Sequence, residues 1–230
     1  MGIKIIKDFI RRNIFSRPGV PMNEIKGLVV HWVAGPGATA KGVRNYFDSL
    51  ADQDPNDDVD DRFAATQLNI GIDGEVVQCM PLTEMAYHVG ARKYTRRALA
   101  ELGAYPNNCT IGVEWCHPEW DGVFTKETYN TGVVLYAWLC KKYNLNPIDD
   151  IYMHYDVTGK ECPRDWVRNP EKFEQFKKDV NAKLQAVNRK EERELRSANA
   201  KKGIVDWQFL REYDSNQPPK EETTLDVEQV

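Results

Sequence analysis

Two histidines and one cysteine stand at positions from which they could share a metal ion. His31 closes the short apolar run 27–30, and His154 closes a second run, 150–154, with Cys162 eight residues further on. Two imidazole nitrogens and one thiolate suit a catalytic zinc ion, because three protein ligands leave the fourth coordination position open for water. A histidine at a strand end is also commonly an ordinary polar residue, so spacing alone leaves both readings open.

Alternating strands and helices are predicted as the elements that carry these residues. Period-2 and short apolar runs predict strands over 27–30, 63–70, 75–80, 110–116 and 150–154. Helical spacing and capping signals predict helices over 41–50, 93–103, 126–143 and from 170 to 184. Asp73-Gly74 is a hairpin turn signal, and Thr125 and Asn144 suit the two ends of the longest helix. This alternation is typical of an α/β fold.

Composition excludes several classes of protein. The 230 residues carry a formal net charge of −4, so no basic footprint for nucleic acid is indicated. The longest apolar runs are far shorter than the roughly 20 residues of a membrane span, and five sparse cysteines do not form a disulfide framework. Charged residues interrupt the run 3–15, so we expect no signal peptide and synthesis in the cytoplasm.

The chain is expected to change character near residue 185. A catalytic domain is predicted over 1–184, and residues 185–230 are predicted to hold a charged helical segment and an acidic tail. Residues 188–202 are charged on all sides, and 212–230 contain six acids and one lysine. Such composition predicts a disordered tail.

Five segments resemble one family in order along the chain. These segments are LVVHWVAG (28–35), IGIDGEVVQCMP (70–81), MAYHVG (85–90), TIGVEW (110–115) and MHYDVTGKECP (153–163). They are similar to the zinc-dependent N-acetylmuramoyl-L-alanine amidases of the type-2 amidase family, and most similar to its phage and prophage endolysin branch. The resemblance implies a central mixed β-sheet flanked by helices, as in peptidoglycan recognition proteins.

The resemblance also implies roles for particular residues. His31, His154 and Cys162 match the family's zinc ligands. Glu114 matches its catalytic glutamate, and Lys160 matches a lysine that some members place near the scissile carbonyl. Alone, Glu114 would read as a surface acid and Lys160 as a solvated lysine.

The resemblance implies a further role for His88, and the chain differs from the family at Thr66 and Gln67. His88 stands where the family lines its substrate groove, although a loop-capping role is an equal alternative. Many relatives have a histidine six residues before the Asp-Gly turn, where this chain has Gln67, and some phage members have a catalytic tyrosine at the position of Thr66. The resemblance therefore does not imply a catalytic role for Thr66 or Gln67.

The implied activity is hydrolysis of the amide between N-acetylmuramic acid and L-alanine in peptidoglycan, with a zinc-activated water. The expected cofactor is Zn²⁺, and the expected partner is peptidoglycan rather than nucleic acid or a membrane. The enzyme would reach the cell wall after release or lysis. Two alternatives stay open: a non-catalytic peptidoglycan-binding module and a cytosolic amidase that recycles muropeptides. The oligomeric state stays open as well.

Overall fold

A computed structural model describes residues 3–56 and 60–201 of the chain. The chain divides into two units, 1–185 and 186–230, which are considered separately. The predicted acidic loop 54–61 falls partly outside the described ranges, and the tail 212–230, predicted to be disordered, falls wholly outside them. Within the described ranges, no helix has both the length and the apolar character needed to span a membrane.

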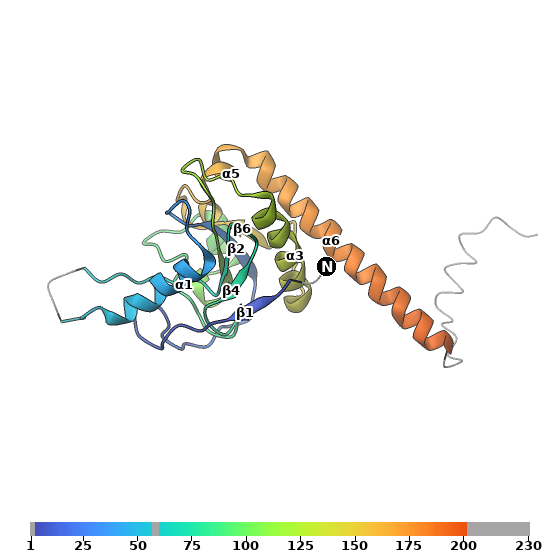
Figure 1. Ribbon diagram of the computed structural model, residues 1–230, viewed down its shortest axis with the longest axis horizontal. Coiled ribbons are helices and arrows are strands. Elements are labelled where there is room, and N and C mark those ends of the chain that lie inside the picture. The colour runs from blue at the N-terminus through green and yellow to red at the C-terminus, as the bar shows by residue number, and fades with distance from the viewer. Residues whose placement is uncertain (1–2, 57–59, 202–230) are drawn as a thin grey trace, which may run out of the picture. The chain divides into compact units, whose positions relative to one another are not determined.

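One mixed sheet of six strands organises the first unit (Figure 1). Its strands are β1 (Ile5–Lys7), β2 (Gly27–Trp32), β3 (Leu68–Ile70), β4 (Val76–Gln78), β5 (Thr110–Trp115) and β6 (Ile151–Met153). They lie in the order β1-β4-β3-β5-β2-β6. β3, β5, β2 and β6 are parallel to one another, and the hairpin at Asp73-Gly74 makes β4 antiparallel to β3. The predicted fold class is therefore confirmed.

Helices cover both faces of this sheet (Figure 1). Those of six residues or fewer are α2 (Arg96–Glu101), α4 (His154–Thr158) and α5 (Arg164–Arg168). The longer ones are α1 (Ala40–Ser49), α3 (Lys126–Tyr143) and α6 (Pro170–Lys201), and the 3₁₀ turns are η1 (Leu50–Asp52) and η2 (Pro106–Asn108). Side chains of α3, α5 and the start of α6 share one core cluster with the sheet. Side chains of α1, α2 and α4 belong to two other clusters, which contain no residue of α3, α5 or α6.

Strand alternation assigns the candidate site to one of these faces. Along β2, Leu28 and Val30 join the core under α3, whereas Val29 joins the cluster with α2 and α4. Successive side chains of a strand point to opposite faces, so His31 shares the face of Val29. By the same rule Glu114 lies opposite Val113, on the same face as His31.

The clearest predicted helix matches the structure at both ends. α3 spans Lys126–Tyr143, and the Thr125 side chain accepts a hydrogen bond from the Thr128 N–H. Asn144 takes the left-handed conformation at the other end, with φ of 55°. Both ends follow from local capping chemistry: the Thr125 side chain supplies a missing acceptor at the start, and the backbone N–H of Asn144 bonds to the Cys140 and Lys141 carbonyls at the end.

Four predicted strands are shorter than expected, among them 75–80 and 110–116, which become Val76–Gln78 and Thr110–Trp115. Only Leu68–Ile70 of the predicted strand 63–70 joins the sheet, because Ala64 N–H and Ala65 N–H donate to carbonyls of Phe15 and Tyr87 in loops. The predicted strand 150–154 ends at Met153. There the Asp156 carboxylate accepts the Met153 N–H at 2.7 Å, so His154 begins α4 rather than ending a strand.

The last helix begins at Pro170, as predicted, and continues to Lys201. Its first part belongs to the first unit, where Phe173, Phe176 and Val180 are buried and Leu184 packs against the same cluster. The short helix α5 was not predicted, because its five residues are too few for a periodic apolar pattern.

Candidate active site

Strand register brings three of the candidate residues to one edge of the sheet. β2 pairs with β5 so that His31 lies opposite Glu114. β2 pairs with β6 so that Val30 lies opposite Met153, and His154 follows at once. All three strands run parallel, so their carboxyl ends meet at the same edge. The open edge beyond the carboxyl ends is the usual place for sites in α/β sheets.

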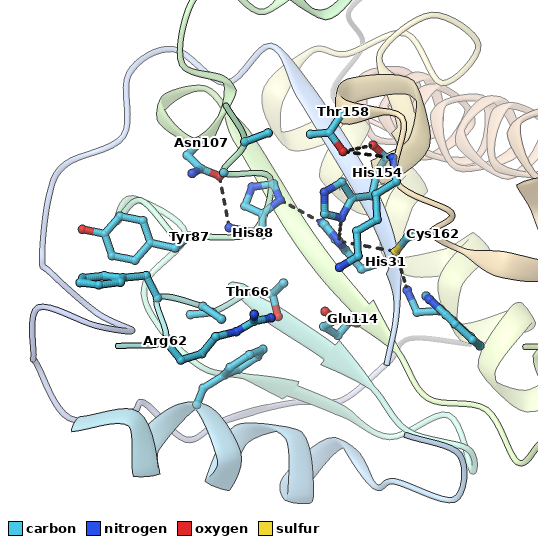
Figure 2. Close-up of a pocket in the computed structure, with 18 of the residues that line it drawn as sticks. His31, Arg62, Thr66, Tyr87, His88, Asn107, Glu114, His154, Thr158 and Cys162 are labelled. Atoms are coloured by element: carbon cyan, nitrogen blue, oxygen red, sulfur yellow. Dashed lines mark hydrogen bonds between the residues drawn. The ribbon is translucent and has the colours of Figure 1, made fainter. Parts of the chain in front are cut away.

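Cys162 reaches this edge from the loop after α4 (Figure 2). The Cys162 carbonyl accepts the Tyr155 N–H at 3.0 Å, and the Trp32 N–H donates to Cys162 Sγ at 3.4 Å. The thiol is thus held beside the residue that follows His31.

The two imidazoles and the thiol form a compact donor set. His154 Nδ1 lies 3.0 Å from His31 Nδ1, and Cys162 Sγ lies 4.0 Å from His31 Nδ1. The three ligand atoms all lie within 4.8 Å of one another, and all three residues are buried. Nitrogen and sulfur donors at this spacing fit one zinc ion, since zinc bonds of about 2.0–2.3 Å place tetrahedral ligands that far apart.

Burial sets the protonation of this donor set. It lowers the pKa of His31 well below its ordinary value, and the neighbouring His154 and His88 lower it further. Burial, with the Lys160 charge, lowers the pKa of His154 to about 3. Burial raises the pKa of the Cys162 thiol. The imidazoles are therefore neutral and offer lone pairs, whereas a metal ion must displace the thiol proton.

A pocket of about 840 Å³ opens over the donor set. Glu114 lines it and is partly buried, and its Oε2 has no hydrogen-bond partner among the described atoms. Burial raises the pKa of Glu114 to about 8, while the Lys160 charge opposes this shift. A carboxyl group whose pKa is moved toward neutrality can both take and give a proton at neutral pH.

Lys160 lines the same pocket and is exposed. Its neighbour Glu161 pairs with Arg164 and Arg168 instead, and the Lys160 ammonium forms no ion pair within 4.0 Å among the described residues, although its charge acts on Glu114 at longer range. Its positive charge is therefore available to a ligand in the pocket.

The remaining sequence candidates separate into two groups. His88 lines the pocket but is buried, and its ring is hydrogen-bonded to His31. Thr66 also lines the pocket, with its hydroxyl on Asn69 Oδ1. Gln67 does not line it: Gln67 Oε1 accepts the Gly112 N–H at 2.8 Å and Nε2 donates to the Glu84 carbonyl, so it joins β3 to β5 and a loop.

Sequence reasoning missed the other end of the pocket. Arg62, Phe63, Tyr87 and Tyr105 line that end, and Figure 2 shows Arg62 and Tyr87 across the pocket from His154 and Cys162. Phe63 falls within the predicted strand 63–70 and Tyr87 within the motif MAYHVG, but neither pattern indicates a place in the pocket, and no pattern marks Arg62 or Tyr105.

Comparison with known proteins identifies the family of the chain. Residues 21–165 match the family described as N-acetylmuramoyl-L-alanine amidase (Amidase_2). The chain belongs to this family. The matched range contains His31, Glu114, His154 and Cys162, so the resemblance predicted from the sequence is confirmed.

Curated members of the amidase family match over most of this chain. A probable N-acetylmuramoyl-L-alanine amidase of Bacillus licheniformis is 37% identical over 182 residues, which cover 79% of this chain and 48% of that protein. The N-acetylmuramoyl-L-alanine amidase BlyA of Bacillus subtilis (strain 168) is 36% identical, with 76% and 46% covered. The chain thus spans about half the length of these relatives.

Solved structures of an endolysin and of a catalytic domain share the fold. A mutant endolysin from Bacillus subtilis is 25% identical, with a TM-score of 0.57, over 80% of this chain and 99% of that one. The catalytic domain of XlyA is 27% identical, with a TM-score of 0.57, over 76% of this chain and 99% of that one.

Proposed function

We propose that this chain hydrolyses the amide bond between N-acetylmuramic acid and L-alanine in bacterial peptidoglycan. The observation that carries the proposal is the buried donor set of His31, His154 and Cys162 with Glu114 beside it in register, at the floor of one pocket. Membership of the amidase family supports the same substrate. Similarity to an endolysin supports intact cell wall as the place of action.

The metal in this proposal is zinc, held by His31, His154 and Cys162. A bound zinc ion would supply a Lewis acid for the scissile carbonyl and a lower pKa for the attacking water. Three protein ligands leave one position open, as catalytic zinc sites require.

Glu114 moves the proton in this proposal. In its ionised form the carboxylate takes a proton from the attacking water, and the carboxyl then gives a proton to the leaving amine of L-alanine. Its unpartnered Oε2 suits the task, because no hydrogen-bonding group among the described residues competes for the proton. A pKa moved to about 8 by burial favours the second transfer.

Lys160 stabilises the negative charge that develops on the scissile carbonyl oxygen. Its ammonium is unpaired among the described residues and lines the pocket. Charged donors that already point at the developing oxyanion lower its free energy without having to reorganise during the reaction.

Replacement of Lys160 by methionine is expected to lower kcat by about 10²–10³-fold, the usual cost of one oxyanion donor. KM should change little, because the charge acts mainly in the transition state. Steady-state hydrolysis of a soluble muramoyl-peptide measures both constants. Lys160→Arg is the matched control and should keep a larger share of kcat. A raised KM with an unchanged kcat would assign Lys160 to ground-state binding instead.

A second prediction concerns the two parts of the chain. All residues that line the pocket, and the apolar face of α6 through Leu184, precede residue 186. Truncation after residue 186 is therefore expected to leave wall hydrolysis unchanged, as a release assay on purified walls would measure. A truncated protein that is folded by circular dichroism but inactive would contradict a catalytic domain over 1–184.

The proposal is tested against its two alternatives with the same protein preparation. The full chain is incubated with purified Gram-positive cell walls and, separately, with soluble muropeptides, each with and without a zinc chelator. Chelator-sensitive solubilisation of intact walls supports the proposal. Wall binding without solubilisation would indicate a recognition module, and cleavage of soluble muropeptides alone would indicate a recycling amidase.

A further inference from the structure

We infer that His88 is a positioning residue, which fixes the tautomer and the ring orientation of the metal ligand His31. The inference rests on the zinc centre proposed above. It replaces the expectation that His88 contacts substrate.

A series of hydrogen bonds runs away from the donor set, and Figure 2 shows its first link, between His31 and His88. His31 Nε2 lies 3.0 Å from His88 Nδ1, with the two rings nearly perpendicular at 84°. His88 Nε2 lies 3.2 Å from the Thr110 carbonyl oxygen and 3.1 Å from Thr110 Oγ1. Thr110 Oγ1 in turn lies 2.7 Å from the Pro106 carbonyl oxygen. Every member is buried, which limits the competition of solvent for these bonds.

The last hydrogen bond of this series, from Thr110 to Pro106, determines the direction of the others. A carbonyl oxygen only accepts, so the Thr110 hydroxyl donates its one proton to the Pro106 carbonyl. The Thr110 hydroxyl and carbonyl oxygens therefore both face His88 Nε2 as acceptors, and His88 Nε2 must carry a proton.

The proton on His88 Nε2 also determines the tautomer of His31. With its proton on Nε2, a neutral His88 presents Nδ1 as an acceptor, so His31 Nε2 donates to it. The lone pair of His31 is left on Nδ1, which is the atom that faces His154 Nδ1 and Cys162 Sγ. The opposite tautomer would place a proton where the metal must bind. A hydrogen bond to the second nitrogen of a ligating histidine commonly sets that choice.

The surroundings of His88 hold the ring in this role. The Asn107 Oδ1 accepts both the His88 N–H at 3.2 Å and the Val89 N–H at 2.9 Å, which fixes the backbone at the base of the ring. Gly112 leaves the space for the ring, since a Cβ there would lie 2.6 Å from the His88 ring. Both η2, through Asn107, and β5, through Gly112, therefore accommodate the His88 side chain, although they lie about 20 residues away in sequence.

Substrate contact fits His88 less well. Only 8% of the residue is exposed. Both ring nitrogens already have protein partners, so neither is free to bond a ligand in the pocket.

Two substitutions at this position separate the roles. The side-chain oxygen of asparagine overlays the Nδ1 of histidine, so His88→Asn keeps the acceptor for His31 Nε2. His88→Phe keeps a ring of similar size and removes the acceptor. Zinc affinity of the full chain is measured by competition with a chromophoric chelator, and circular dichroism checks that each variant is folded.

We expect His88→Phe to weaken zinc binding by about 10–100-fold, the usual cost of losing an outer partner of a ligating histidine. His88→Asn should stay close to wild type. With zinc at saturation, hydrolysis by His88→Phe should show an unchanged KM. Unchanged zinc affinity in His88→Phe, or a raised KM in both variants, would overturn the positioning role while leaving the proposed function intact.

A measurement on the unaltered protein covers the case in which His88→Phe does not fold. Long-range ¹H–¹⁵N spectra of the zinc-free chain report the tautomer of each histidine. We expect the proton of His31 on Nε2, and a proton on Nδ1 would overturn the inference. Failure of the wild-type chain to bind zinc is a separate result, which would overturn the proposed zinc centre and this inference together.

Discussion

Replacement of Cys162 by serine is expected to abolish zinc binding at micromolar metal and, with it, hydrolysis of peptidoglycan. The serine hydroxyl stays protonated at neutral pH, whereas the thiol loses its proton to a metal ion and becomes a strong ligand. Loss of an outer partner of a metal ligand costs about 10–100-fold in affinity. Loss of a direct ligand should cost more than about 100-fold. Zinc stoichiometry by atomic spectroscopy and wall release are measured on the same samples.

The chain contains a matched control for this substitution. Cys140 is also buried and free, but it belongs to the core cluster under α3 and does not line the pocket. Cys140→Ser should therefore keep both zinc and activity, although it can lose stability. A folded Cys162→Ser variant that binds zinc as tightly as the wild type would contradict the donor set.

Replacement of Glu114 by glutamine is expected to lower kcat by about 10²–10⁴-fold, the usual contribution of a general acid and base. Zinc binding should persist, because Glu114 is not among the three donors. Steady-state kinetics and zinc stoichiometry test the two parts together. Glu75→Gln is the control: Glu75 Oε2 is also buried without a partner, but Glu75 does not line the pocket. Equal activity of Glu114→Gln and Glu75→Gln would contradict the assignment.

The same substitution should stabilise the zinc-free protein, increasingly so as pH rises. Burial raises the pKa of Glu114 from 4.5 to about 8 in the folded chain. Between those values the unfolded chain has lost its proton and the folded chain has kept it, so the free energy of unfolding falls as pH rises. One pKa unit corresponds to about 1.4 kcal/mol. From pH 5 to pH 7, the advantage of Glu114→Gln over the wild type should therefore grow by at most about 3 kcal/mol.

Urea unfolding in the presence of a chelator, at several pH values, measures this difference. Glu114→Gln and wild-type curves that stay parallel from pH 5 to pH 8 would show that Glu114 is not held protonated by burial.

Sequence patterns predicted the elements whose ends depend on neighbouring residues in the sequence. α3 was predicted to the residue, because Thr125 and Asn144 cap its two ends through their own side chains and backbone. The strand predicted over 63–70 was too long, because partners distant in sequence decide where pairing stops. Ala65 N–H bonds to the Tyr87 carbonyl in a loop, a contact that no window around residue 65 contains.

The candidate site shows the same division. The strand-end positions of His31 and Glu114 were visible in short apolar runs, and the structure places the two residues opposite each other. The contact of His88 with His31 spans 57 residues. It depends on the space at Gly112 and on the direction of the Thr110 hydroxyl bond. Such a role follows only from the three-dimensional structure.

The most direct test of the central claim is the identity of the bond that is cut. Purified peptidoglycan is digested with the zinc-loaded chain, and the products are analysed by mass spectrometry after labelling of new amino groups. We expect new L-alanine amino ends and peptide-free glycan strands, with no new reducing sugar ends. New reducing ends, or new amino ends on a residue other than L-alanine, would contradict it.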